Sequence, residues 1–259
     1  PDWLIKGNYS KQQVKQFMID YIVKIMTPLK GKVNSWTVVN EPLGHPWDNP
    51  TIYADFFHKK LGPDYNWIIE AFETAHNVDP EATLILNDYR IEIPGEKLYD
   101  PTNANKIFGI VKEIKRRGIP IEVGFQMHLY GSQLANPQTL DQLSKNFRQN
   151  IRRYREIGVG VNITEWDIRM GEVSGTNEVR MMKQANMYKT LMKVALEEGI
   201  KNINFFNLDD NHSWLEDPTW GGPNASKNDP TLKVSEFSRK PAWYAINQAL
   251  LEYLLESSQ

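Results

Sequence analysis

Apolar and polar residues follow two different periods along this chain. Amphipathic stretches repeat apolar residues every three to four positions, which predicts helices. Ser10 can cap the first of these helices. The predicted helices cover residues 10–29, 64–78, 103–118, 140–158, 178–199 and 241–255.

Short apolar runs rich in β-branched residues lie between the helices. Such runs predict strands that are covered on both faces. The predicted strands cover residues 32–41, 83–88, 121–128, 159–168 and 203–210. Strands that alternate with helices of this length are typical of parallel βαβ units, so we expect an α/β fold.

Polar residues end each apolar run. They are Asn40-Glu41, Asn87-Asp88, Gln126 and His128, Glu165 and Asp167, and Asp209-Asp210. In a (β/α) barrel the carboxyl ends of the strands form one face, and that face holds the active site. Because no Gly/Ser linker or shift in composition divides residues 1–259, we expect a single domain.

The composition excludes several classes of function. The 259 residues are 41% hydrophobic and 24% charged, with a formal net charge of −2. This near-neutral balance gives no support for nucleic-acid or anionic-membrane binding, and no apolar stretch approaches the ~18 residues of a membrane span. The absence of cysteine excludes disulfides and thiolate metal sites.

Glu41 and Glu165 are the candidate chemical pair. Two carboxylates on different strands of one barrel can flank a glycosidic bond, about 5–5.5 Å apart in a retaining glycosidase. A lone glutamate is more often a solvated surface residue. A metal site built from Glu41, His128, Glu165 and Asp167 is a further alternative, but these residues lack the close helical spacing of many ligand sets.

The motifs "WTVVNE", "LILNDYRIE", "VGFQMHL", "ITEWDI" and "KPAWYAI" together resemble glycoside hydrolase family 10, the endo-β-1,4-xylanases. Asn-Glu-Pro alone would also suit the family 5 cellulases, whereas "GFQMHL" followed by "ITEWDI" favours family 10. The resemblance covers essentially the whole chain. It implies a TIM (β/α)8-type barrel and one glycoside hydrolase catalytic domain over residues 1–259.

The resemblance implies a retaining double-displacement mechanism on xylan or xylo-oligosaccharides. Glu41 would be the general acid and base, Glu165 the nucleophile, and Asn40 the hydrogen-bond partner of the sugar 2-hydroxyl. No metal or organic cofactor is expected. The family resemblance also implies a secreted, extracellular protein.

Further residues would support this pair. By resemblance, His128 and Gln126 would orient the nucleophile, with Asp167 behind His128. Tyr89 would line the leaving-group side, and Trp214 would form a stacking platform beneath the sugar.

The sequence departs from the family pattern in two places. Phe206 stands where the family usually has tryptophan. The pattern of strands four to eight is present, but strands one to three have no counterpart, so we expect an incomplete barrel. That barrel would be completed by a complementary segment or by self-association. A sugar-binding protein without turnover and a cellulase-like endoglucanase are the alternative functions.

Overall fold

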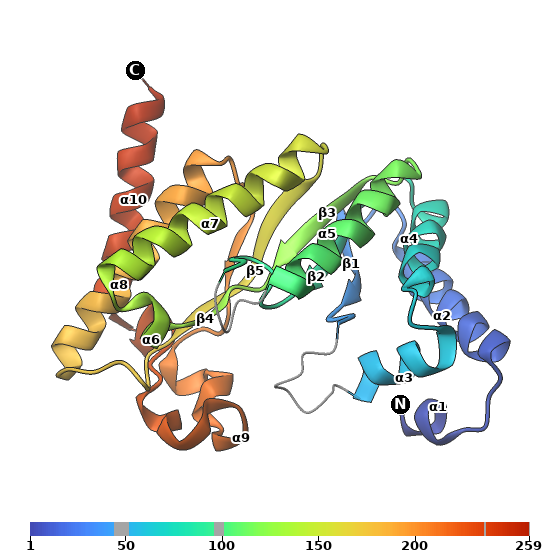
Figure 1. The fold of residues 1–259 in the computed structure, drawn as a ribbon, viewed down its shortest axis with the longest axis horizontal. Helices are drawn as coiled ribbons and strands as arrows, with labels where there is room; N and C mark the ends of the chain where they lie inside the picture. The colour runs from blue at the N-terminus through green and yellow to red at the C-terminus, as the bar shows by residue number, and fades with distance from the viewer. Residues whose placement is uncertain (44–51, 96–100, 236, 259) are drawn as a thin grey trace. The chain divides into compact units, whose positions relative to one another are not determined.

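The computed structural model describes residues 1–43, 52–95, 101–235 and 237–258 (Figure 1). It contains two compact units. Unit 1 comprises residues 1–88, 102–124 and 157–160, and unit 2 comprises residues 89–101, 125–156 and 161–259.

Unit 1 is built on three neighbouring strands, in the order β1 (Ser35–Asn40), β2 (Thr83–Asp88) and β3 (Ile121–Phe125). β1 and β2 are parallel, and their register places Asn40 opposite Asn87. The helices of this part of the chain are α1 (Asp2–Lys6), α2 (Lys11–Met26), α3 (Ile52–Leu61), α4 (Asn66–Val78) and α5 (Pro101–Arg116), and a short 3-10 turn at Thr27–Leu29 follows α2.

The start of α2 follows from its capping residues. The Ser10 hydroxyl accepts a hydrogen bond from the Gln13 backbone N–H, and the Ser10 backbone N–H donates to the Gln13 side chain. This capping box satisfies N–H groups that the first turn leaves without helical partners. α2 packs against α4. The apolar face of α2 is only partly covered, since Tyr21 is 69% exposed.

Unit 2 is organised around β5 (Gly160–Arg169), which pairs in parallel with β4 (His128–Tyr130) and with β6 (Ile203–Phe205). α8 (Asn177–Glu197) packs against α7 (Pro137–Glu156) and α10 (Pro241–Ser257). The remaining elements are α6 (Gly131–Leu134), α9 (Pro218–Gly221), an antiparallel hairpin of β7 (Lys233–Ser235) and β8 (Ser238–Arg239), and 3-10 turns at Asp210–His212, Trp214–Glu216 and Gly222–Lys227.

Every predicted strand is present, and the predicted alternation of strands and helices is confirmed. The run predicted at 203–210 is shorter than expected, because β6 ends at Phe205 and Asp210 begins a 3-10 turn. The run at 121–128 differs from the prediction because it is broken into β3 and β4. Met127, between them, has a φ of 63°, which extended pairing does not allow. The hairpin of β7 and β8 and the helices α1, α3, α6 and α9 were not predicted. Among the described strands, no pairing closes a barrel.

Within the described ranges, no helix has both the length and the apolar composition needed to cross a membrane.

Candidate active site

Backbone strain is concentrated just after the strands. Of the six described non-glycine residues with positive φ, four lie within two residues of a strand's carboxyl end. They are Glu41 (φ 51°), Arg90 (55°), Met127 (63°) and Asn207 (67°). Such conformations cost about 1–3 kcal/mol each and cluster at functional sites. Glu41 is itself a predicted site residue, Arg90 follows the predicted Tyr89, and Met127 lies between the predicted Gln126 and His128.

In unit 2, Glu165 lies beside His128. The His128 Nε2 is 3.5 Å from the Glu165 Oε2, and the Nδ1 is 2.9 Å from the Asp167 Oδ1. The β4–β5 register places His128 directly opposite Asp167. Residues 165 and 167 share one face of β5 because side chains alternate along a strand. One imidazole can therefore contact both carboxylates.

Asp167 is held from its other side by Trp214. The Trp214 indole N–H donates to the Asp167 Oδ2 at 2.8 Å, and Asp167 is only 1% exposed. The rings of Trp214 and Phe206 lie 5.0 and 5.1 Å from the His128 ring, centroid to centroid. Both carboxylate oxygens of Asp167 are thus engaged, and the imidazole is fixed in one orientation. We call this chain of contacts, from Trp214 through Asp167 and His128 to Glu165, the nucleophile relay.

The relay makes His128 a cation at neutral pH. Burial lowers the pKa of the imidazole, but the carboxylates of Asp167 and Glu165 raise it by more than burial lowers it. The resulting pKa is about 10. A protonated imidazole donates from both of its nitrogens. Its charge stabilises the negative charge of Glu165, as a carboxylate nucleophile requires.

In unit 1, the end of β1 presents Asn40 and Glu41. The Asn87 side-chain amide donates to the Asn40 Oδ1 at 2.8 Å, and the Glu41 backbone N–H donates to the Asn87 backbone carbonyl at 2.9 Å. These two bonds orient the Asn40 amide and the backbone of Glu41. Asn87 therefore supports both residues. Its position at the end of the next strand, opposite Asn40, is consistent with this role.

Tyr89 and Gln126 also follow strands, as predicted. Tyr89 is half-buried just after β2, and the Arg90 guanidinium lies 5.8 Å from its ring centroid. Gln126 is 1% exposed and comes directly after β3. Both belong to unit 2, whereas Asn40 and Glu41 belong to unit 1. The orienting role expected for Gln126 stays a prediction.

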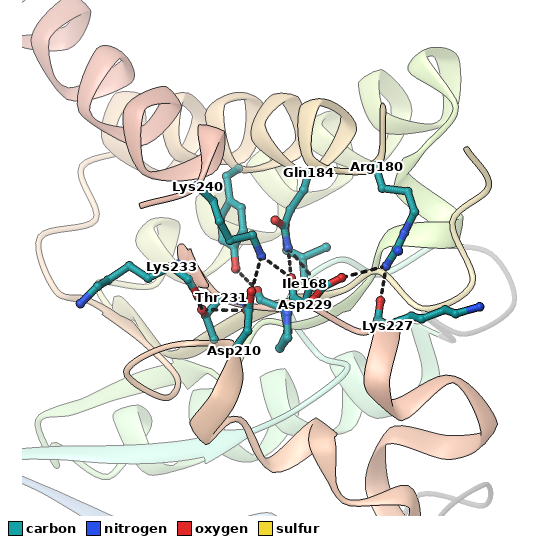
Figure 2. Close-up of polar contacts among 11 residues, drawn as sticks. Ile168, Arg180, Gln184, Asp210, Lys227, Asp229, Thr231, Lys233 and Lys240 are labelled. Atoms are coloured by element: carbon teal, nitrogen blue, oxygen red, sulfur yellow. Dashed lines mark hydrogen bonds and ion pairs between the residues drawn. The ribbon is translucent and has the colours of Figure 1, made fainter. Parts of the chain in front are cut away.

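Unit 2 also contains a buried polar network around Lys240 and Asp210 (Figure 2). At its centre the Lys240 Nζ is 3.0 Å from the Asp210 Oδ2 and donates to the Asp229 carbonyl at 2.6 Å. The other Asp210 oxygen accepts from the Thr231 backbone N–H and hydroxyl, at 2.8 and 2.9 Å. Burial lowers the pKa of Lys240, although the negative charge of Asp210 raises it in part. Burial likewise raises the pKa of Asp210, although the positive charge of Lys240 lowers it in part.

This network includes residues that lie close in the sequence to members of the relay. The Ile168 backbone N–H, one residue after Asp167, donates to the Pro230 carbonyl at 3.1 Å. Asp210 opens the 3-10 turn whose continuation carries Trp214. Gln184 donates to the Asp229 carbonyl at 2.6 Å and to the Ile168 carbonyl at 3.3 Å (Figure 2). The segment that follows residue 227 therefore joins the end of β5 to the loop after β6.

No group of three or more histidines and carboxylates within the described part of the chain has the arrangement of a metal site. A carboxylate and its fixed imidazolium, with aromatic rings around them at strand ends, are typical of a hydrolase that works by acid–base and nucleophilic chemistry. The comparisons with known proteins specify the class. The model of glycosyl hydrolase family 10 matches residues 1–249, and the chain belongs to that family.

Curated relatives agree with this assignment. The chain is 28% identical to endo-1,4-beta-xylanase B of Thermotoga neapolitana over 99% of its length, and 31% identical to endo-1,4-beta-xylanase A of Humicola insolens over 96%. It is 30% identical to endo-1,4-beta-xylanase A of Thermoanaerobacterium saccharolyticum over 95% of its length. The chain spans 67%, 60% and 20% of the lengths of these three relatives, respectively.

Solved structures show the same likeness. Native xylanase 10B from Thermotoga maritima superposes with a TM-score of 0.79 at 29% identity, covering 99% of this chain and 72% of that one. Xylanase 10B from Thermotoga petrophila, solved with xylobiose, gives a TM-score of 0.77 at 28% identity, with 97% and 70% covered. The family is a (β/α) barrel family, so the fold class and the family expected from the motifs are confirmed.

Sequence reasoning missed several supporting residues. The motif match identified the relay's members, but the indole–carboxylate bond of Trp214 adds a role to the stacking expected for it. Phe206 was noted only as a departure, yet its ring contacts His128. One feature of the sequence pointed weakly to burial of Lys240. This lysine directly precedes an apolar helix that begins with Pro241.

Proposed function

We propose that this protein is a retaining endo-β-1,4-xylanase, with Glu165 as the nucleophile and Glu41 as the general acid and base. The nucleophile relay carries the proposal, because it fixes and charges an imidazole beside Glu165 in a member of this hydrolase family. The choice of xylan is supported by relatives named as xylanases and by related structures bound to xylobiose and xylotetraose.

In the first step the Glu165 carboxylate attacks the anomeric carbon of the sugar. The glycosidic C–O bond breaks, and Glu41 gives its proton to the departing oxygen. The two carboxyl groups of a retaining enzyme must then lie about 5–5.5 Å apart. A hydrogen bond from Asn40 to the sugar 2-hydroxyl strengthens as positive charge develops on the ring.

In the second step Glu41 acts as a base. It removes a proton from water, the water oxygen bonds to the anomeric carbon, and the ester bond to Glu165 breaks. The configuration at that carbon is thereby retained. The His128 imidazolium stabilises Glu165 both as attacking carboxylate and as leaving group. Tyr89 and Trp214 supply the surfaces that hold neighbouring sugars.

Substitution of the two glutamates tests the proposal. We expect Glu165→Ala to remove measurable release of reducing sugar from xylan, and Glu41→Ala to lower kcat/KM by about 10²–10⁴-fold, the usual range for a general acid–base. Glu172→Ala is the matched control, since this exposed glutamate follows β5 and is not one of the pair. Unchanged activity in either test variant would refute its assignment.

Azide distinguishes the two roles. An activated aryl β-xylobioside supplies a leaving group that needs no acid. In Glu165→Ala, azide occupies the space of the lost carboxylate and gives the α-glycosyl azide. In Glu41→Ala, azide attacks the glycosyl–enzyme and gives the β-azide. Any other pairing of variant and product anomer would contradict the assignment.

The same preparation decides between the alternatives. Binding of xylo-oligosaccharides in a calorimeter without any product would favour a sugar-binding protein. A higher rate on carboxymethylcellulose than on xylan would favour a cellulase-like enzyme. We expect product formation with a clear preference for xylan.

We also propose that the outer edges of β1 and β6 pair with another strand, from a second copy or from a complementary segment. Among the described strands, β1 pairs with β2 alone and β6 pairs with β5 alone. An unpaired strand edge is a template for a further strand. Light scattering on the eluting protein tests this: a fully active species with the 30.0 kDa mass of one chain would contradict it.

A further inference from the structure

The turn that carries Glu41 is strained. Its φ of 51° is left-handed, a region that L-residues with a long side chain rarely adopt. The residue before a proline also prefers extended backbone, and Pro42 follows directly. If this turn relaxed, the Cα–Cβ bond of Glu41 would rotate and its carboxyl group would move. The conformation therefore needs support from its surroundings.

Two hydrogen bonds flank this turn. On its amino side the Glu41 N–H donates to the Asn87 carbonyl at 2.9 Å. On its carboxyl side the His58 Nε2 lies 2.9 Å from the Pro42 carbonyl oxygen. Because that oxygen can only accept, the His58 Nε2 carries the proton and donates. His58 thus reaches back from α3 to the residue next to Glu41.

An aromatic cluster holds His58 rigidly. Its ring lies edge-on to Tyr65 at 4.7 Å and to Trp67 at 6.0 Å, centroid to centroid. The neighbouring Phe57 stacks on Trp67 at 5.1 Å with an angle of 19° between the rings. Phe56 of the same helix is buried. The imidazole is therefore fixed to the start of α4 and cannot follow a shift of the turn.

The choice of histidine here has a cost. The His58 Nδ1 is buried and has no hydrogen-bond partner among the described residues. A buried polar atom without a partner typically costs about 1–3 kcal/mol. A leucine would fill similar space without this penalty, so packing alone does not account for the imidazole. The bond from Nε2 to the Pro42 carbonyl does account for it.

We propose that His58 is a positioning residue, which holds the Glu41–Pro42 turn so that the Glu41 carboxyl is placed to protonate the leaving group. This inference rests on the proposed function, in which Glu41 is the general acid. A misplacement of about 1 Å can cost ~100-fold in rate. We therefore expect loss of the tie to lower acid catalysis by about 10–100-fold.

The leaving-group dependence of kcat/KM tests the proposal. Aryl β-xylobiosides range from dinitrophenyl, whose departure needs no proton, to phenyl, whose departure does. For His58→Leu we expect kcat/KM to fall by about 10–100-fold on the phenyl substrate and to stay within about twofold of wild type on the dinitrophenyl substrate. His58→Gln keeps an N–H donor of similar reach and should recover most of the loss.

His76→Leu is the matched control. His76 also has a buried Nδ1 without a described partner, but it lies at the far end of α4. We expect it to show no dependence on the leaving group. Equal losses of His58→Leu on all substrates, or no loss on any, would overturn the inference. If Glu41→Ala itself lost equal activity on both substrates, the proposed acid role of Glu41 would fail instead.

Discussion

Replacing the buried Lys240 by methionine should destabilise the protein by about 3 kcal/mol. Methionine keeps an unbranched chain of similar volume but removes the charge and its three donors. The Lys240 side chain is fully buried, and its ammonium group faces the Asp210 carboxylate at 3.0 Å (Figure 2). The substitution therefore leaves a buried carboxylate without its cation.

The magnitude follows from the contacts that remain. Removing one partner of a buried ion pair typically costs about 3–5 kcal/mol. Asp210 keeps its two hydrogen bonds from Thr231, which continue to stabilise part of its charge. The Asp229 carbonyl also keeps the donor from Gln184. We therefore expect a loss near 3 kcal/mol, the lower end of the range.

Urea denaturation followed by tryptophan fluorescence measures this loss. The free energies of unfolding of the wild type and of Lys240→Met are extrapolated to water. Lys233→Met is the matched control, since the Lys233 side chain points away from the network in Figure 2. Its change should stay within about 0.5 kcal/mol of the wild type.

A second substitution and pH sharpen the test. Adding Asp210→Asn to Lys240→Met removes the orphaned charge and should restore about 1–2 kcal/mol. Without its cation, the folded-state pKa of Asp210 lies further above its unfolded value near 3.8. The deficit is then absent below that value and grows as pH rises toward 7. A deficit under 1 kcal/mol, or one that is equal at pH 4 and pH 7, would refute this reasoning.

Three further outcomes follow from the site. The folded-state pKa of His128 is raised to about 10 from 6.5, so the protonated imidazole stabilises the fold fully below pH ~6.5 and this stabilisation is lost as pH rises through ~10. In urea titrations, the stability advantage of the wild type over His128→Asn should therefore shrink between pH 6 and pH 10.5. Trp214→Phe removes the donor to Asp167 and should cost about 1–3 kcal/mol together with activity on xylan; unchanged values would contradict the relay. Trp214→Phe should also move the pH dependence of kcat/KM, whereas the exposed Trp220→Phe should not.

The helices and strands and the kind of chemistry could be predicted from the residue pattern. Helix and strand periods are local properties of the chain, so the alternation of parallel strands and helices could be read from residue spacing. Glu165 and Asp167 are likewise assigned to one face of β5 by spacing alone, because side chains two positions apart in a strand point the same way. Polar residues at the ends of apolar runs located the site, and the motifs specified the family.

Which of these residues contact one another depends on how the chain folds in three dimensions. The β4–β5 register brings His128 to Asp167 across 39 residues, and the fold brings Lys240 to Asp210 across 30 residues. The tie from His58 to Pro42 likewise depends on where α3 packs. Spacing in the sequence does not encode such pairings, because each is set by the packing of elements that are distant along the chain. The left-handed backbone of Glu41 was equally unreadable, since a glutamate before proline predicts extended structure and only surrounding contacts hold it elsewhere.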